Sequence, residues 1–292
     1  MVRLMKTGLP LRYAKAAAIA AVIAAQPVAA SANIIDTFYE RSFVLAANER
    51  CRLFAPGVTS ALTSAALQAR GAAARSGAND VVLGETAARA RARAARTACN
   101  DPDLVVVRGR VTEAFSGWTR TPRMSFPGAT ASWSANRSAF SSPTWRLMQA
   151  SSTGASPVTF GYAAGGGQAQ DLQAVVSWFG RPRPYAVRIV MRDADRAPRP
   201  WLVGQGVLPP EAQRRVIFSS GGRDAAPTLL SADKSNGQAW TFPASTADAL
   251  ARLDPREPFV IEFLFRDDSV ARTTFEAGDF AAGRAFIAMG SL

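Results

Sequence analysis

The chain has 292 residues, of which 48% are hydrophobic and 19% are charged, and these globular proportions argue against a disordered chain and against a membrane-spanning one. The formal net charge is +12, from 34 Lys and Arg against 22 Asp and Glu. There is no histidine, which excludes a Ser-His-Asp triad, a Cys-His pair and the common zinc sites.

Arginine carries almost all of the positive charge. The only lysine beyond residue 15 is Lys234, and alanine is abundant as well. An excess of both residue types is typical of a G·C-rich genome, so the charge alone does not indicate a nucleic-acid partner. We expect no nucleic-acid partner, and we keep an envelope protein or an anionic ligand as possible partners.

The first 32 residues have the pattern of a cleavable secretory signal. Basic residues without an acid come first, an apolar run over 16–25 follows, and Ala30-Ser31-Ala32 is a small-residue cleavage site. We therefore expect a signal peptide over 1–32, a mature chain that begins at Asn33, periplasmic or secreted localisation, and no transmembrane segment after cleavage. An uncleaved anchor is the alternative, but the apolar run is short and mostly alanine.

Residues 33–121 are rich in alanine and periodic, which predicts a bundle of four helices. The first helix ends at Pro56-Gly57, and Thr59 is the candidate cap of the second, which stops at Ser76-Gly77. Apolar residues recur every three or four positions in both helices. These stripes are Ile35, Tyr39, Phe43, Ala47, Cys51 and Phe54, and then Val58, Leu62, Ala65, Ala69 and Ala73.

A third helix is predicted over 80–98 and a fourth over 103–115, with Asp103 as the cap of the fourth. The third helix has a stripe of small side chains, which let a neighbouring helix approach closely, so we expect the helix to pack through it. The stripe consists of Gly84, Ala88, Ala92, Ala95 and Cys99.

The two cysteines, Cys51 and Cys99, are predicted to form one disulfide. Three consecutive helices joined by short connections run up, down and up, which places the ends of the first and third on the same side. A disulfide there would close a loop of the chain, and in the chain-entropy model it would stabilise the folded state by about 4 kcal/mol. A redox pair or a metal site fits less well, because the chain has no Cys-x-x-Cys spacing and no histidine.

Residues 122–292 change character and read as a β-rich domain. Strands are predicted at 145–148, 158–160, 175–179 and 187–192, with Gly165-Gly166-Gly167 as a loop. Asn236-Gly237 predicts a hairpin between Leu229-Leu230 and 240–242, and 259–265 should pair with 270–275. Short helices are expected at 245–253 and, capped by Asp279, at 280–289.

These elements define the fold class as α+β: an N-terminal disulfide-linked antiparallel helical bundle (33–121) followed by a mainly antiparallel β-sandwich or open barrel (122–292).

The closing order of a short helix, two long strands and Gly278-Asp279-Phe280-Ala281-Ala282 before a final apolar helix resembles the C-terminal half of the invasion-associated locus B family of exported proteins. The resemblance covers about 50 residues and implies a small periplasmic β-sandwich of poorly defined role. Members usually have cysteines in the sandwich, which this domain lacks, and no functional residue is carried over.

One constellation near the predicted domain boundary could bind a ligand. Aromatic rings interleaved with guanidiniums can stack on sugars or peptide aromatics and hold anions through paired hydrogen bonds. The alternative is that the tryptophans are core residues and the arginines solvate the rim. The residues are Trp118, Arg120, Arg123, Trp133, Arg137, Trp145 and Arg146.

Paired carboxylates are the catalytic groups that the sequence leaves open. The pairs are Asp193 with Asp195, Asp267 with Asp268, and Glu276 with Asp279. Each pair lies at a predicted turn or strand end, where such residues are favoured for backbone hydrogen bonding alone. We predict no catalytic residue, no metal and no cofactor.

The sequence favours an exported, non-catalytic protein that binds an envelope partner or ligand. Two alternatives stay open: a carboxylate-dependent hydrolase acting on envelope carbohydrate, and a structural or assembly factor of the outer envelope.

Overall fold

A computed structural model describes residues 26–292 except 166–167, 181 and 205. Most of the predicted signal peptide therefore lies outside the described residues, and residues 26–32 are the start of the first helix. Within the described chain, no helix combines the length and the apolar character needed to cross a bilayer.

Four helices make up the first part of the described chain, where the sequence predicts them. They are α1 (Gln26–Cys51), α2 (Pro56–Arg75), α3 (Asp80–Arg96) and α4 (Pro102–Thr119). Pro56 lies in the first turn of α2, where its missing N–H costs no hydrogen bond. Asn79 caps α3 by accepting a hydrogen bond from the N–H of Val82 at 2.9 Å.

Two of the caps predicted for the helical half are wrong. Thr59 lies inside the first turn of α2, and its hydroxyl donates to the carbonyl of Ala55. Asp101, rather than Asp103, caps α4, because the Asp101 carboxylate accepts the N–H of Asp103 at 2.9 Å. Pro102 fills the first helical position in α4, so the cap falls on the residue before it.

The prediction for the packing face of α3 is also wrong. Leu83, Thr86, Ala90 and Ala94 are the buried residues of α3, whereas the stripe of small residues that begins at Gly84 faces solvent. At about 100° of rotation per residue, the centres of the two faces lie about 150° apart around the helix, so they point in nearly opposite directions. Leu83 supplies more apolar area than any small residue, and burial follows that area.

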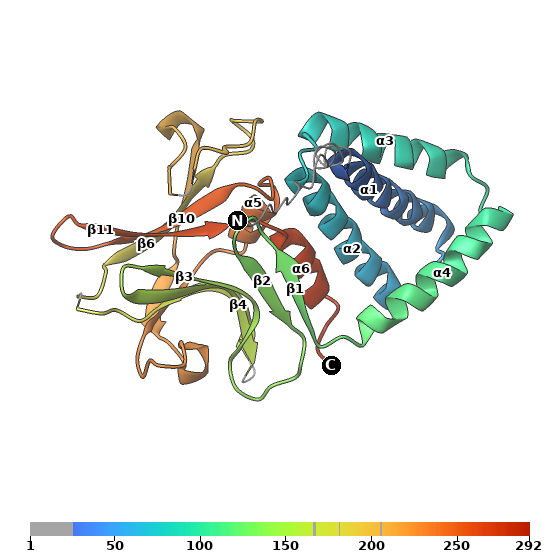
Figure 1. Cartoon of the computed structure of the whole chain (residues 1–292). Helices are drawn as coiled ribbons and strands as arrows, with labels where there is room; N and C mark the ends of the chain where they lie inside the picture. Colours follow the sequence, from blue (N-terminus) through green and yellow to red (C-terminus); the bar gives the residue numbers. More distant parts are fainter. Residues whose placement is uncertain (1–25, 166–167, 181, 205) are drawn as a thin grey trace, which may run out of the picture.

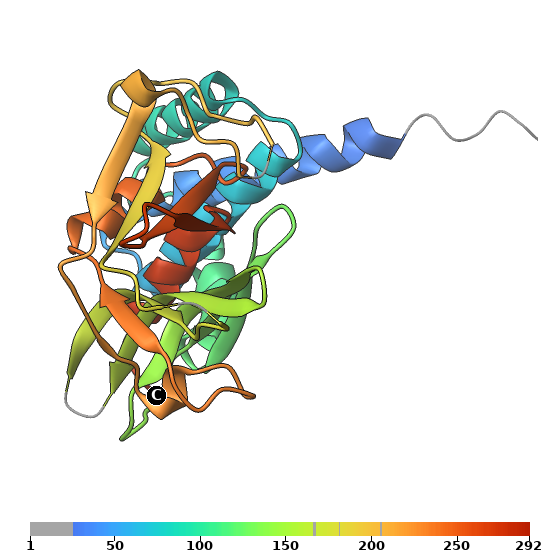
Figure 2. The ribbon, with the colours of Figure 1, turned by 90° about the vertical axis from the view of Figure 1, so that its left-hand side faces the viewer.

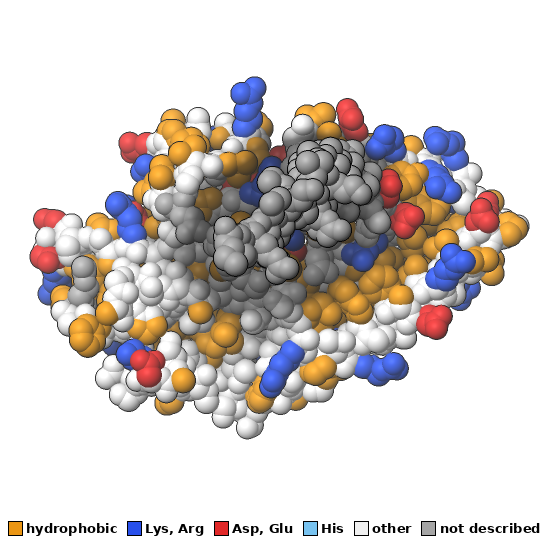
Figure 3. Space-filling view, in the orientation of Figure 1, with side chains coloured by type: hydrophobic (Ala, Val, Ile, Leu, Met, Phe, Trp, Pro, Cys, Tyr) orange, Lys and Arg blue, Asp and Glu red, His pale blue; other side chains and the backbone are white. Residues whose placement is uncertain are grey.

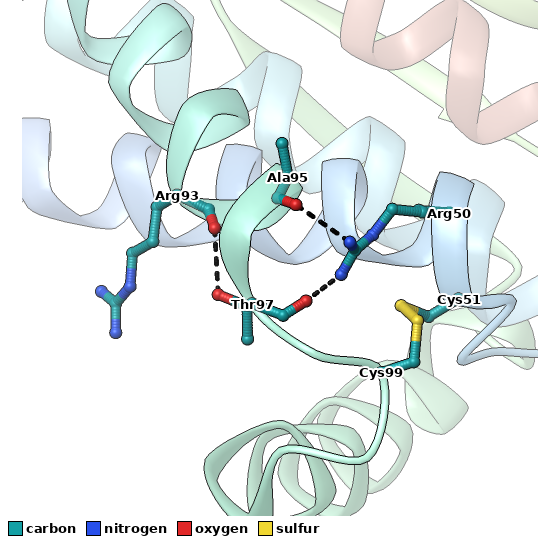
Figure 4. Close-up of a disulfide and its surroundings, with 6 residues drawn as sticks. All are labelled: Arg50, Cys51, Arg93, Ala95, Thr97 and Cys99. Atoms are coloured by element: carbon teal, nitrogen blue, oxygen red, sulfur yellow. Dashed lines mark hydrogen bonds between the residues drawn. A yellow bond between two sulfur atoms is a disulfide. The ribbon is translucent and has the colours of Figure 1, made fainter.

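The Cys51–Cys99 disulfide forms as predicted, with the two Cα atoms 5.5 Å apart. It joins the C-terminal end of α1 to the connection between α3 and α4 (Figure 4). Beside it, Arg50 donates to the carbonyl of Ala95 at 2.9 Å and to that of Thr97. The end of α1 is therefore tied to the end of α3 by one covalent bond and by a guanidinium.

The described strands form a seven-stranded sheet in the order β1-β2-β3-β4-β5-β9-β8 and a four-stranded sheet in the order β11-β10-β6-β7, with antiparallel pairing throughout. The strands are β1 (Arg123–Pro127), β2 (Ser132–Asn136), β3 (Thr144–Thr153), β4 (Ser156–Gly165), β5 (Gln168–Val176), β6 (Ala186–Arg192), β7 (Arg214–Phe218), β8 (Gly221–Asp224), β9 (Gln238–Thr241), β10 (Pro258–Leu264) and β11 (Val270–Glu276). The α+β class is confirmed.

The inner faces of the two sheets share one aromatic core. Phe160 of β4 contacts Phe259 of β10 and Phe275 of β11, with ring centroids 5.5 and 5.6 Å apart. All four residues predicted to point inward from β10 and its end are at most 1% exposed: Phe259, Ile261, Phe263 and Phe265. Alternation along each strand produces this face, because successive side chains point to opposite sides of a sheet.

The hairpin predicted at Asn236-Gly237 does not form. Leu229 ends a short 3₁₀ helix, η2 (Pro227–Leu229), instead of a strand, and β9 pairs with β5 and with β8. The segment 225–237 crosses the outer face of the larger sheet, where Leu229 is buried with Val175 and Ala239. Burial of Leu229 on that face competes with strand pairing, and the local Asn-Gly signal is outweighed.

Two α-helices lie among and after the last strands of the described chain: α5 (Ser245–Ala251) follows β9, and α6 (Phe280–Ile287) follows β11. Figure 1 shows α6 (red) between the strands and α2, and in Figure 2 the strands lie in front with the helical half behind. Gly283 of α6 packs against Leu147 of β3, and the carbonyl of Ala282 accepts the hydroxyl of Ser64 of α2 at 2.8 Å. Helix α6 is therefore shared by the two halves.

Asp279 precedes α6 but does not cap it with its side chain, contrary to the prediction. Its carboxylate instead accepts two hydrogen bonds from Arg75 of α2, at 2.7 and 2.9 Å. Burial raises the pKa of Asp279 although the hydrogen bond from Arg75 opposes that shift. Gly71 leaves the room for this contact, because a Cβ there would lie 1.8 Å from Oδ1 of Asp279.

Candidate functional site

A groove of about 480 Å³ runs over the outer face of β1, β2 and β3. It is lined by Arg123, Met124, Ser125, Ser134, Ala135, Asn136, Thr144, Trp145, Met148 and Thr228. The register places Ser125 opposite Ser134 and Ser134 opposite Met148, so hydroxyls and a thioether form the floor. The inward-facing neighbours, Phe126 and Trp133, belong to the core.

Arg123 and Trp145, two of the predicted binding residues, lie in this groove. The indole N–H of Trp145 donates to the carbonyl of Leu229 at 3.1 Å, which fixes the ring. Arg123 is exposed, and no described carboxylate lies within ion-pair distance of it. The groove therefore combines a positioned aromatic ring with a guanidinium whose charge is not neutralised.

Three other predicted residues are buried and donate hydrogen bonds within the protein. Trp133 is fully buried, and its N–H is shared by the carbonyls of Glu276 and Ala277 at 3.1 and 3.0 Å. Arg137 donates to the carbonyls of Gly290, Trp118, Thr119 and Met289. Arg146 donates to the carbonyl of Ser138 and to the hydroxyl of Ser291. Burial lowers the pKa of Arg137 and of Arg146.

Trp118 and Arg120 complete the predicted set, and neither lines the groove. Trp118 packs edge-to-face on Phe115 at 5.5 Å and contacts the apolar cores of both halves. Arg120 is exposed at the C-terminal end of α4. The structure thus brings two of the seven predicted residues into one groove and distributes the others over core, junction and surface.

A second hollow, a pocket of about 260 Å³, lies on the same sheet face on the other side of η2. Its lining comprises Pro143, Ala163, Ala164, Asp171, Gln173, Arg223, Asp224, Ala225, Ala226, Leu229 and Ala239. Sequence reasoning missed this pocket. The available signal was the alternation of polar Asp171 and Gln173 with apolar Leu172 and Ala174 along β5, which indicates polar groups on the outer face.

Five of the six carboxylates in the predicted pairs are hydrogen-bonded to other groups. Arg215 bonds both Asp193 and Asp195, at 3.0 and 2.8 Å, and Arg252 also pairs with Asp195. The hydrogen bond from Arg252 lowers the pKa of Asp195, and backbone and arginine hydrogen bonds lower that of Asp193 despite its burial.

Three of the four carboxylates in the other two pairs are engaged as well. Glu276 accepts the N–H groups of Ala129 and Thr130 at 2.6 and 2.9 Å, which holds the β1–β2 turn, and Asp279 pairs with Arg75. Asp267 accepts from the N–H and the hydroxyl of Ser269 in the β10–β11 turn. These carboxylates are committed to structural hydrogen bonds.

The remaining charged side chains do not form a single cluster in the view of Figure 3. Figure 3 shows apolar side chains gathered over the helical half between α2 and α4, with Lys, Arg, Asp and Glu around them. Within the described residues, no group of three or more Cys, Asp or Glu side chains is placed to hold a metal ion.

Comparisons with protein-family models, with curated proteins and with solved structures found no match to this chain. The resemblance to the invasion-associated locus B family therefore stays a prediction.

Proposed function

We propose that this protein is an exported, non-catalytic binding protein whose groove over β1, β2 and β3 holds an acidic sugar chain of the cell envelope. The observation that carries the proposal is the pairing of a fixed, half-buried Trp145 with an unneutralised Arg123 over a hydroxyl-bearing floor. The apolar C–H face of a sugar ring packs against an indole, and a guanidinium binds a carboxylate through two hydrogen bonds.

The composition of the groove supports a saccharide in particular. Ser125 and Ser134 present hydroxyls that can donate and accept, which suits the mixed donors and acceptors of a sugar. The disulfide supports export, because such bonds persist in oxidising compartments. The commitment of the candidate carboxylates to arginines and backbone N–H groups supports binding over hydrolysis.

The binding test compares an acidic and a neutral oligosaccharide of equal length. Calorimetry with tetragalacturonic acid and with maltotetraose should show tighter binding of the acidic chain. Arg123→Gln should lower the affinity for the acidic oligosaccharide about tenfold and leave the affinity for the neutral one unchanged. Trp145→Phe, which keeps an apolar ring against Leu229, should weaken both.

Arg120→Gln is the matched control, since Arg120 is also exposed and lies three residues away in the chain but does not line the groove. Equal affinity for the two saccharides, or an equal loss in the Arg120 and Arg123 variants, would contradict the proposal.

Export has its own test. Intact mass of the protein from the envelope fraction should show a chain that begins at Asn33 and lacks the two hydrogens of the oxidised thiols. Recovery of a full-length, reduced chain from the cytoplasm would overturn this part of the proposal and leave the groove unaffected.

A further inference from the structure

The pocket beyond η2 has a floor of small side chains. Ala163 of β4 and Ala239 of β9 face outward there, and the segment 225–229 and Pro143 form its walls. A volume of about 260 Å³ lies below the range usual for drug-sized ligands. The pocket therefore has room for a small molecule and not for a folded partner.

The charges in the pocket are of both signs and two of them are unpaired. Asp171 of β5 and Arg223 of β8 make no ion pair with any side chain in the described part of the chain. Asp224, the third charged group, is held by Arg183. Asp171 and Arg223 are thus available to a ligand that has one charge of each sign.

A neutral polar group lies on the same face. Gln173 is 2% exposed and lines the pocket, and its Oε1 has no hydrogen-bond partner among the described residues. A buried, unpaired amide oxygen is costly, and rotation of the amide about its last torsion exchanges its oxygen and nitrogen at the pocket. A ligand with both a donor and an acceptor near its middle would satisfy whichever atom faces it.

The strand register gives the span between the charges. Asp171 is four residues along β5 from Val175, which is level with Ala239 and, one strand further, with Arg223. Four residues along and two strands across separate the two Cα atoms by about 16 Å. The long arginine side chain closes part of this distance, but the gap exceeds the separation of the two charges of a single α-amino acid.

We propose that this pocket binds the zwitterionic form of a dipeptide. The ammonium pairs with Asp171, the carboxylate pairs with Arg223, and the central peptide group bonds the amide of Gln173. Two residues in an extended conformation span about 7 Å, which suits two charged groups that approach from opposite ends. The small floor formed by Ala163 and Ala239 leaves room for short side chains. This site is separate from the groove.

Calorimetry on the purified full-length protein tests the proposal with L-alanyl-L-alanine and three analogues. N-acetyl-alanyl-alanine lacks the ammonium, alanyl-alanine amide lacks the carboxylate, and glycine has both charges on one carbon. Each should bind roughly tenfold or more weakly than alanyl-alanine. Equal binding of alanyl-alanine and either blocked analogue, or no binding of alanyl-alanine at millimolar concentration, would overturn the proposal.

Variants assign each charge to its residue. In Asp171→Asn the free and acetylated dipeptides should bind equally, and in Arg223→Gln the free dipeptide and its amide should bind equally. Persistence of either preference in the corresponding variant would overturn the assignment, and the wild-type comparison decides the proposal if a variant fails to fold. Arg123→Gln should leave dipeptide binding unchanged, which separates this site from the proposed sugar groove.

Discussion

The helical half and the β-sandwich bury different kinds of side chain. Five of the twelve buried residues in the cluster inside α1–α4 are alanines at 2% exposure or less: Ala47, Ala61, Ala65, Ala90 and Ala94. The largest fully buried side chains of the sandwich are Trp133 and a set of phenylalanines. Alanine removes little apolar area from water, so the helical half needs a covalent tie, whereas the sandwich holds together through aromatic area without one.

The largest expected effect of any substitution is in the sandwich. Phe160→Ala removes a fully buried ring that contacts four others, those of Trp133, Phe242, Phe259 and Phe275. We expect a loss of about 3 to 5 kcal/mol in the free energy of unfolding, measured by urea denaturation. Phe140→Ala, at a ring that is 44% exposed, is the control and should cost under about 0.5 kcal/mol. Similar losses in both variants would contradict the comparison.

The disulfide should be the next largest contribution, and it should act on the helical half. The bond closes a separation of 48 residues, so Cys51→Ser with Cys99→Ser should lower the free energy of unfolding by roughly 2 to 4 kcal/mol. Reducing agent should destabilise the wild type by the same amount and leave the double variant unchanged. A double variant as stable as the oxidised wild type would show that the alanine-rich core is sufficient.

The contact between the two halves can be tested by replacing Gly71, with Gly84 on the exposed face of α3 as the control. Gly71→Ala places a methyl group against the Asp279 carboxylate and should cost roughly 1 to 3 kcal/mol. In Gly84→Ala the added Cβ meets no described atom within 4 Å beyond the nearby backbone of its own helix, so the variant should stabilise α3 by up to about 1 kcal/mol. Thermal melts of the two variants should therefore shift in opposite directions, and a shift in the same direction would argue against a close contact at Gly71.

The smallest expected effect is a pH dependence of the free energy of unfolding, which arises from Glu262 in the sandwich. Burial alone raises the pKa of Glu262, but hydrogen bonds from Arg272 and Arg188, both at 2.7 Å, outweigh it and hold that pKa below its ordinary value. The stabilisation is complete above the ordinary glutamate pKa and is lost as the pH falls through the lowered one. Urea midpoints between about pH 6 and about pH 3 should fall less steeply in Glu262→Gln than in wild type.

Glu85→Gln, at an exposed position on α3 without an ion pair to any described side chain, is the control for that measurement and should leave the slope unchanged. If the urea midpoint falls equally steeply with pH in Glu262→Gln and in wild type, Glu262 does not contribute to the loss of stability in acid.

The sequence was sufficient for the elements that depend on neighbouring residues. Periodicity in α1 and α2, alternation in β10 and the cysteine positions at two helix ends all express local geometry, and these elements and the disulfide form. The first helix is shorter at its end than predicted, because α1 ends at Cys51 and Phe54 of the predicted stripe lies beyond it. The predicted binding set is dispersed in the structure, because only Arg123 and Trp145 line the same groove. Arg137 and Arg146 look like surface cations in a list of residues, yet backbone carbonyls distant in the chain surround them.

What the sequence determined by itself is the α+β order, the disulfide and the inward faces of the strands, because spacing and side-chain size decide these within a few residues. The tertiary structure alone decided the partner of β9, the exposed face of α3 and the selection of Arg123 and Trp145 from the predicted set. It also created the pocket at Asp171 and Arg223. Those outcomes depend on burial and charge pairing between segments far apart in the chain, which no local pattern records.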